Sequence, residues 1–258
     1  RHHMSVMVTM ASTRICGLVE VSEVQRQMTC DLFESHGKKC PAFYNTIGEL
    51  VKAQGAPDAA FINTPHKFHL ENARDCLKAD MDVLLEKPMV INAVEARRLM
   101  KFRDQSKKLL VVAFPGSLSP AVKKAKQMIS SGKLGRVTSV SAYVHQHWKA
   151  GTSGQWRQDP EISGGGFLFD TGSHMVNTVV DLIDQDVVQV CALMDNCGTP
   201  VDINSTVSGR FRDGAMFSLA AAGDSMHCTS EVTVIGDRGI LQTGIWGERL
   251  LYKSIKDA

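Results

Sequence analysis

Short, continuous apolar runs recur through residues 1–115, and helix-length segments separate them. The runs lie at 14–20, 58–63, 83–85 and 109–114. A strand that is apolar on both faces is typical of a parallel sheet covered by helices on each side, whereas a half-exposed strand alternates polar and apolar residues. The first 115 residues are therefore predicted to form a doubly wound α/β domain.

The pattern changes at residue 116. Two helices are predicted at 120–131, with Gly132 as a left-handed cap, and at about 167–183. A long alternating run covers 136–148, and further strands are predicted at 187–194, 203–211, 215–222, 231–235 and 240–243. Residues 116–258 are therefore predicted to form an α+β domain with a large, mostly antiparallel open sheet.

Composition excludes several classes of partner. The 29 basic residues nearly balance the 27 acidic ones, which gives no electrostatic footprint for nucleic acid or a membrane surface. No apolar run approaches the about 20 residues that cross a bilayer, so we expect neither partner and a cytoplasmic location. Seven cysteines without a Cys-x-x-Cys pair predict reduced, mostly buried thiols, and neither a disulfide framework nor a zinc site.

Two polar segments follow predicted strands directly, namely Asn63-Thr64-Pro65 and Glu86-Lys87-Pro88. Ligands of open α/β sheets bind outside the carboxyl ends of the strands. There the ammonium of Lys87 could stabilise negative charge that develops on a substrate oxygen beside a nicotinamide. The alternative is a solvated lysine at a strand end. His66 and His69 follow Pro65 as pocket-wall residues or as ordinary polar groups of a first helical turn.

Asp170 and His174 are four residues apart, so a helix places both on one face. A carboxylate beside an imidazole would fix its tautomer and raise its basicity, and an ordinary histidine pKa of about 6.5 suits a general base. The alternative is a solvent-facing pair. The preceding glycines, 164–166, favour the catalytic interpretation because they would let a ligand approach the backbone closely.

Other candidate residues carry weaker signals. Glu20 ends a strand and could accept hydrogen bonds from an adenosine ribose, which favours NAD over NADP, or it is a surface residue. Trp156 and Arg157 are interpreted as holding an anionic or polyol substrate, or as loop packing. His145 and His147 share a strand face, but without a third ligand nearby we predict no metal site.

Both ends of the chain are expected to be incomplete. A dinucleotide-binding fold opens with a strand and a Gly-x-Gly-x-x-Gly turn that holds the pyrophosphate, and no such turn precedes Glu20. Residues 1–4 are interpreted either as the start of the helix after that turn or as a tag remnant before Met4. The C-terminal domain is likewise expected to be shortened.

Four segments, in this order and spacing, resemble the glucose–fructose oxidoreductase/inositol dehydrogenase/MocA (Gfo/Idh/MocA) family. They are Asp58-Ala-Ala-Phe-Ile-Asn-Thr-Pro-His-Lys-Phe-His69, Glu86-Lys87-Pro88, Ser131-Gly-Lys-Leu-Gly135, and the glycines of 164–166 followed by Asp170 and His174. The resemblance covers about residues 2–245. It departs from many members at His66, where they have Asn, and at 114–118, where they have an arginine.

The resemblance implies an NAD(P)-binding Rossmann domain in residues 1–115 and a substrate and oligomerisation domain in 116–258. It also implies a cis Lys87–Pro88 bond and a homo-oligomer formed through the open sheet. With the residue patterns, it assigns catalysis to Lys87, Asp170 and His174, and substrate binding to these three with Trp156 and Arg157. The cofactor-binding candidates are Glu20, Asn63, Thr64, Pro65, His66, His69, Glu86, Lys87 and Pro88.

The sequence thus predicts a dehydrogenase that transfers a hydride between NAD, or NADP, and a sugar, polyol or related hydroxy compound. In this hypothesis His174 takes the hydroxyl proton while Lys87 polarises the same oxygen. Two alternatives share the fold, an NAD-dependent glycoside hydrolase without net redox change and a non-catalytic sensor of sugars or nucleotides.

Overall fold

The computed structural model describes residues 2–255, which divide into two compact units. The first unit takes the described residues up to Ile62, together with Leu70–Leu85 and Arg97–Val111. The second takes Asn63–His69, Glu86–Ala96 and the described residues from Val112 onward. The segments that follow the third and fourth strands therefore belong, by their contacts, to the second unit.

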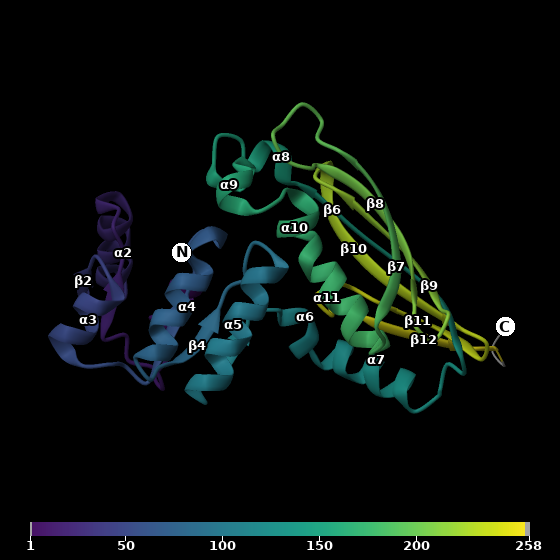
Figure 1. Cartoon of the computed structure of the whole chain (residues 1–258), viewed down its shortest axis with the longest axis horizontal. Helices are drawn as coiled ribbons and strands as arrows, with labels where there is room; N and C mark the ends of the chain where they lie inside the picture. The colour runs from purple at the N-terminus through teal and green to yellow at the C-terminus, as the bar shows by residue number, and fades with distance from the viewer. Residues whose placement is uncertain (1, 256–258) are drawn as a thin grey trace. The chain divides into compact units, whose positions relative to one another are not determined.

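The first unit alternates helices with short parallel strands (Figure 1). Its elements are α1 (His2–Met7), β1 (Gly17–Val19), α2 (Glu23–Ser35), β2 (Ala42–Tyr44), α3 (Ile47–Gln54), β3 (Ala59–Ile62), α4 (His69–Lys78), β4 (Asp82–Leu85), α5 (Ala93–Ser106) and β5 (Leu110–Val112). β1 pairs with β2 in parallel, and β3 pairs with β4 in parallel, with β5 beside β4. The predicted parallel α/β architecture is confirmed.

The parallel strands form two sheets of two and three strands. In a doubly wound sheet with the strand order 3-2-1-4-5-6, strand 1 lies between the pair 3-2 and the group 4-5-6. The described residues contain no strand ahead of Gly17, and the two groups form separate sheets.

Side chains near the helix starts explain why these helices begin where they do. Ser22 and Thr46 cap α2 and α3 by accepting hydrogen bonds from the backbone N–H groups of Gln25 and Glu49. Asn92 precedes α5, and its Oδ1 accepts from the backbone N–H of Glu95 at 2.9 Å.

The second unit contains a seven-stranded sheet with the order β12-β11-β10-β6-β9-β8-β7. These strands are β6 (Val137–His147), β7 (Val187–Asp195), β8 (Asn204–Phe211), β9 (Met216–Ala222), β10 (Asp224–Gly236), β11 (Gly239–Thr243) and β12 (Leu250–Ser254). β6 and β9 run parallel, and the other neighbours are antiparallel. The predicted open, mostly antiparallel sheet is confirmed.

Two helices, α7 (Pro120–Ser130) and α11 (Gly172–Ile183), lie along one face of this sheet (Figure 1). The core between them includes Val122, Val140, Met175 and Leu182. Six shorter helices complete the unit: η1 (His66–Phe68), α6 (Pro115–Leu118), α8 (Trp148–Gly151), η2 (Trp156–Gln158), α9 (Pro160–Ser163) and α10 (Phe167–Asp170). The single helix predicted at 167–183 is therefore two helices, α10 and α11, with Thr171 between them.

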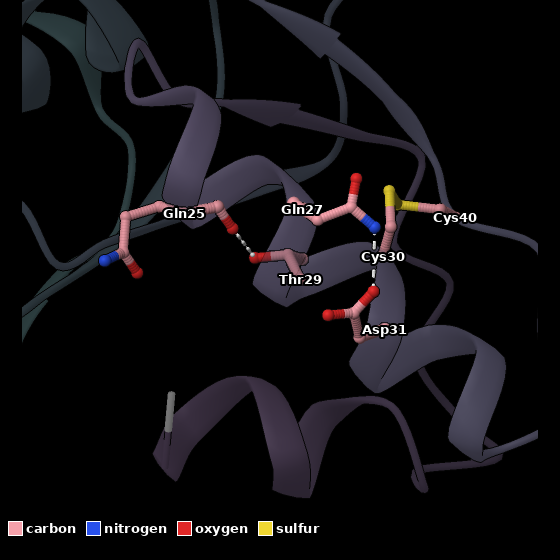
Figure 2. The surroundings of a disulfide bond; sticks show 6 residues. All are labelled: Gln25, Gln27, Thr29, Cys30, Asp31 and Cys40. Atoms are coloured by element: carbon pink, nitrogen blue, oxygen red, sulfur yellow. Dashed lines mark hydrogen bonds between the residues drawn. A yellow bond between two sulfur atoms is a disulfide. The ribbon is translucent and has the colours of Figure 1, made fainter.

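The prediction for the cysteines is wrong in two respects. Cys30 of α2 forms a disulfide with Cys40 (Figure 2), because the turn after α2 returns the chain beside the helix within ten residues. Gly37 has a φ of +65° in this turn, and the N–H of Lys38 bonds to the carbonyl of Phe33. Among the free cysteines only Cys76 is buried, so the thiols are not mostly buried.

Within residues 2–255, none of the helices has both the length and the apolar character that crossing a bilayer requires.

Candidate active site

The second unit brings Lys87 and Asp170 into direct contact. Lys87 follows the end of β4, and its peptide bond to Pro88 is cis, as the resemblance implied. Its Nζ donates to Oδ1 of Asp170 at 2.5 Å and to the backbone carbonyl of Asp170 at 2.9 Å. An ammonium group has three N–H donors, so one remains after these two bonds.

Asp170 is the last residue of α10 and is buried, with 5 % of the residue exposed. Its second oxygen, Oδ2, accepts from the indole N–H of Trp148 at 2.8 Å and lies 3.4 Å from Nε of Arg157. Burial acts to raise the pKa of Asp170, but the charge and hydrogen bond of Lys87 outweigh it, with help from Trp148 and Arg157. The pKa of Asp170 is therefore below its usual range, and the group is a carboxylate.

His174 lies on α11 between two aromatic rings and forms no hydrogen bond with Asp170. The ring centroids of Phe114 and Trp246 are 5.7 Å and 5.8 Å away, and Nδ1 is buried without a hydrogen-bond partner among the described residues. Burial, followed by the nearby charge of Lys87, lowers the pKa of His174 to about 4. The imidazole is therefore neutral at neutral pH, and its base form is the resting form.

The predicted interaction, in which the Asp170 carboxylate fixes the tautomer of His174, is thus wrong. The four-residue spacing places both side chains near Lys87, as the electrostatic effects of Lys87 and Asp170 on His174 show. The carboxylate accepts hydrogen bonds from donors of distant segments, Lys87 and Trp148, and Nδ1 of His174 has no described partner. The histidine pKa is correspondingly lower than the ordinary value that the sequence interpretation assumed.

His66 and His69 are both buried and tie the strand-end segments to the rest of the unit. Nδ1 of His66 lies 2.8 Å from the carbonyl oxygen of Ser163, so this nitrogen carries the proton, and Nε2 lies 3.9 Å from Asp170 Oδ1. Burial lowers the pKa of His66 to about 4. The nitrogens of His69 each lie 2.9 Å from a carbonyl oxygen, that of Pro88 or of Thr64, and burial lowers its pKa. Neither nitrogen of His69 is left for a ligand.

The three glycines at 164–166 allow close packing within the chain, and Gly164 and Gly165 also line a hollow beside α11. A Cβ on Gly164 would lie 2.7 Å from the side chain of Ile91, and one on Gly165 would lie 2.7 Å from that of Phe169. A Cβ on Gly166 would collide with the backbone of Asp202, whose carboxylate also accepts the N–H of Gly166 at 2.7 Å. The close approach that glycine permits is therefore made by the chain itself.

The substrate candidates Trp156 and Arg157 belong to this cluster. The guanidinium of Arg157 lies over the Trp156 ring at 4.4 Å, and the Trp156 ring meets that of His66 edge to face at 4.7 Å. Arg157 is the more exposed partner of Asp170, with 37 % of its side chain accessible. Both residues therefore line the same cluster as Lys87 and Asp170.

The remaining cofactor candidate, Glu20, belongs to the first unit. It follows β1, and its Oε1 accepts the backbone N–H of Ser22 at 2.8 Å, which fixes the carboxylate at the start of α2. Its backbone carbonyl accepts from Nε of Arg26 at 2.7 Å. Asn63, Thr64, Pro65, Glu86 and Pro88 all lie in the second unit, next to the buried His66 and His69.

Sequence reasoning missed the aromatic residues that surround the site. Trp148 was placed only at the end of an alternating run, yet its indole bonds to Asp170; Phe114 and Trp246 contact His174. A tryptophan at the end of a strand carries no local signal of such a partner, because the partner lies 22 residues away.

A hollow of about 820 Å³ lies along the outward side of α11, lined by Phe114, Phe169, Val176, Asn177 and Met194 among others. None of Lys87, Asp170 and His174 lines it. Three aspartates, Asp181, Asp184 and Asp202, do line the hollow, whereas the lysine and histidines of the candidate site lie outside it. His145 stacks on Tyr143 at 4.9 Å, and the described residues contain no metal-binding cluster of His, Cys, Asp or Glu.

Comparison with known proteins gives two matches to models of one family. A model described as an oxidoreductase family with an NAD-binding Rossmann fold matches residues 1–114, and a GFO/IDH/MocA C-terminal domain matches residues 122–242. The chain belongs to the Gfo/Idh/MocA family of oxidoreductases. The resemblance drawn from the sequence motifs is confirmed.

Among curated Gfo/Idh/MocA relatives, the chain is 29 % identical over 215 residues to D-xylose 1-dehydrogenase [NADP(+)] of Haloarcula marismortui. This match covers 78 % of the chain and 59 % of the relative, so the chain spans about three fifths of that protein. Solved structures with the same fold include GenD2 from gentamicin A biosynthesis in complex with NAD, at 22 % identity and a TM-score of 0.83 over 95 % of the chain and 68 % of GenD2. They also include levoglucosan dehydrogenase with NADH and levoglucosan, at 21 % identity and a TM-score of 0.81 over 94 % and 68 %.

The residues present fit the nicotinamide cofactor that the Gfo/Idh/MocA family implies. Glu20, fixed at the carboxyl end of β1, offers a second carboxylate oxygen that no described hydrogen bond engages. The buried and unpartnered Nδ1 of His174 is an orphaned polar atom beside the Lys87 ammonium. Such an atom costs stability unless it serves a ligand or a reaction.

Proposed function

We propose that the protein is an NAD(P)-dependent dehydrogenase that transfers a hydride between the cofactor and a CH–OH group of a sugar, polyol or related compound. One observation carries the proposal: a lysine ammonium held by Asp170 acts electrostatically on a neutral histidine whose buried Nδ1 has no described partner. The named activities of relatives, on xylose and levoglucosan, support the substrate class.

Each catalytic side chain has a defined task in this reaction. The third N–H of Lys87 donates to the substrate hydroxyl oxygen and stabilises the negative charge that develops there. Neutral His174 accepts the hydroxyl proton, and Asp170 keeps the ammonium aligned through Oδ1 and its backbone carbonyl. The nicotinamide, when bound, accepts the hydride from the carbon. Glu20 would bind the adenosine ribose and favour NAD over NADP.

The experiment is a substrate panel with the full-length protein. Purified protein with NAD or NADP is offered pentoses, hexoses, anhydrosugars and cyclic polyols, and cofactor reduction is followed by absorbance. We expect reduction with at least one compound and a loss of about 100-fold or more in kcat for Lys87→Ala and His174→Ala. Tyr252→Phe, on the distant β12, serves as the control and keeps its activity.

Two results would favour the alternatives. Release of nitrophenol from aryl glycosides when no cofactor is added would support the glycoside hydrolase. Cofactor and sugar binding without turnover, unchanged in Lys87→Ala and His174→Ala, would support a sensor.

The domain division, the oligomeric state and the cellular location complete the proposal. The cofactor domain would comprise residues 1–115 and the substrate domain residues 116–258, in keeping with the residues that the two family models match. A homo-oligomer would form through the open sheet, whose edge strand β7 is exposed along its whole length and presents Leu193 at 76 % exposure. The enzyme would work in the cytoplasm, where the nicotinamide cofactors are available.

A further inference from the structure

A buried tryptophan holds the oxygen of Asp170 that faces away from Lys87. Trp148 begins α8 directly after β6 and is 6 % exposed. Its indole has one donor and no acceptor, and that donor bonds to Oδ2 of Asp170 at 2.8 Å. The carboxylate is therefore shared between two donors, the ammonium of Lys87 on Oδ1 and the indole on Oδ2.

Trp148 is itself fixed from two sides. Its backbone carbonyl accepts hydrogen bonds from the N–H of Thr152 at 2.9 Å and from the hydroxyl of Thr152 at 2.8 Å. Its ring packs on Phe167 with centroids 5.9 Å apart. Phe167 is the first residue of α10, the short helix that ends with Asp170. The indole thus contacts the same helix at its start and at its end.

A second donor competes for the same oxygen from the exposed side. Nε of Arg157 lies 3.4 Å from Oδ2, and the Arg157 side chain is the more accessible of the two. If the indole N–H were removed, the carboxylate could turn toward this guanidinium. Oδ1 would then leave its short bond with Lys87, because both oxygens turn together about one torsion.

We propose that Trp148 is a positioning residue that acts through Asp170: its indole N–H fixes the carboxylate so that Oδ1 aligns the Lys87 ammonium. The kinetic tests rest on the proposed function. The proposal goes beyond it by assigning a role to a residue outside the lysine, aspartate and histidine set.

The first experiment removes the indole N–H and keeps an aromatic ring at position 148. In the full-length enzyme, Trp148→Phe lowers kcat about 10- to 100-fold, the effect of losing one hydrogen bond to a charged group, with KM changed less than about 3-fold. Tyr252→Phe is the control, since it removes one side-chain donor, the O–H that bonds to the carbonyl of Lys133, and keeps an aromatic ring.

A double-mutant cycle separates positioning from packing. If Trp148 acts through Asp170, Trp148→Phe has no further effect on kcat in the Asp170→Asn background. An equal loss in both backgrounds, or an unchanged kcat in Trp148→Phe alone, overturns the proposal. Should Trp148→Phe not fold, benzothienylalanine at this position replaces only the N–H by sulfur, and the same outcomes apply.

A readout without turnover distinguishes failure of this inference from failure of the proposed function. NMR of labelled aspartate carboxyl groups follows the titration of Asp170, and its midpoint rises in Trp148→Phe if the indole stabilises the carboxylate. An unchanged midpoint overturns the inference. A raised midpoint in a protein that reduces no cofactor with any compound of the panel overturns only the proposed activity.

Discussion

At the scale of single residues, Asp170 is the point on which the candidate site depends. It accepts hydrogen bonds from Lys87 and Trp148, and Arg157 lies beside the same carboxylate. Two cations thus share one buried carboxylate, while His66 and His174 are uncharged because burial lowers the pKa of each to about 4. These groups leave an excess of positive charge, which suits a reaction that develops negative charge on an oxygen.

The low pKa of His174 predicts an unusual pH dependence. A proton acceptor must be neutral, and with a pKa of about 4 His174 remains neutral well below the ordinary histidine value of about 6.5. We expect kcat/KM for oxidation to stay level from about pH 8 to pH 5 and to fall only near pH 4. Initial rates across this range, with circular dichroism to confirm that the protein stays folded, provide the measurement. A decline centred near pH 6.5 would contradict the environment described for His174.

The sequence suggested Lys87, Asp170 and His174 as candidates, but it did not predict their contacts. Helical spacing predicts which side chains share a face, and this brought Asp170 near His174. The choice of hydrogen-bond partner depends on donors from other segments, here the lysine after β4 and the tryptophan after β6. No local pattern encodes such a contact over 83 or 22 residues.

At the scale of elements, the glycines before α10 show how one sequence signal supports two interpretations. Glycine indicates close approach to the backbone, and the structure contains that approach, but the approaching atoms belong to Asp202, Ile91 and Phe169. The carboxylate of Asp202 also caps this turn, since it accepts from the N–H groups of Gly166 and Leu168 at 2.7 Å and 2.8 Å. The turn positions α10 and therefore Asp170.

Two glycine substitutions distinguish steric from conformational cost. Gly166→Ala would place a methyl group against the backbone of Asp202, and we expect it to lower the free energy of unfolding by about 3 kcal/mol. Gly132→Ala is the matched control, because Gly132 has a φ of +72° but open space around it, and it should cost about 1 kcal/mol. Urea unfolding of both variants is the measurement, and equal costs would show that the Asp202 contact does not determine the need for glycine.

Most elements could be predicted from the sequence, but two short strands and the disulfide could not. Apolar runs and helical periods predicted β3, β4 and the long strands of the second unit. The strands β2, at Ala42–Tyr44, and β12, at Leu250–Ser254, were not predicted. The Cys30–Cys40 bond was missed because it depends on the turn that follows α2.

At the scale of the whole molecule, the second unit contains all the histidines of the site and all three tryptophans, Trp148, Trp156 and Trp246. His66 and His174 are uncharged in the folded protein at neutral pH because burial lowers the pKa of each to about 4, and burial also lowers the pKa of His69. Tryptophan fluorescence therefore reports unfolding of the same unit whose stability these histidines affect. The burial that keeps His66 and His174 neutral should also make this unit sensitive to acid.

We predict that the second unit loses stability as the pH falls from about 6.5 toward 4. In this range the unfolded chain binds protons at His66 and His174 and the folded chain does not, so protonation favours unfolding. His66 and His174, whose pKa values fall from 6.5 to about 4, should each contribute about 3 kcal/mol of this loss by pH 4. Urea midpoints from tryptophan fluorescence at several pH values measure it. His66→Asn should flatten the dependence, whereas His227→Asn, at an exposed site, should leave it unchanged. A midpoint constant from pH 7 to pH 4.5 would show that these imidazoles are not held neutral by burial.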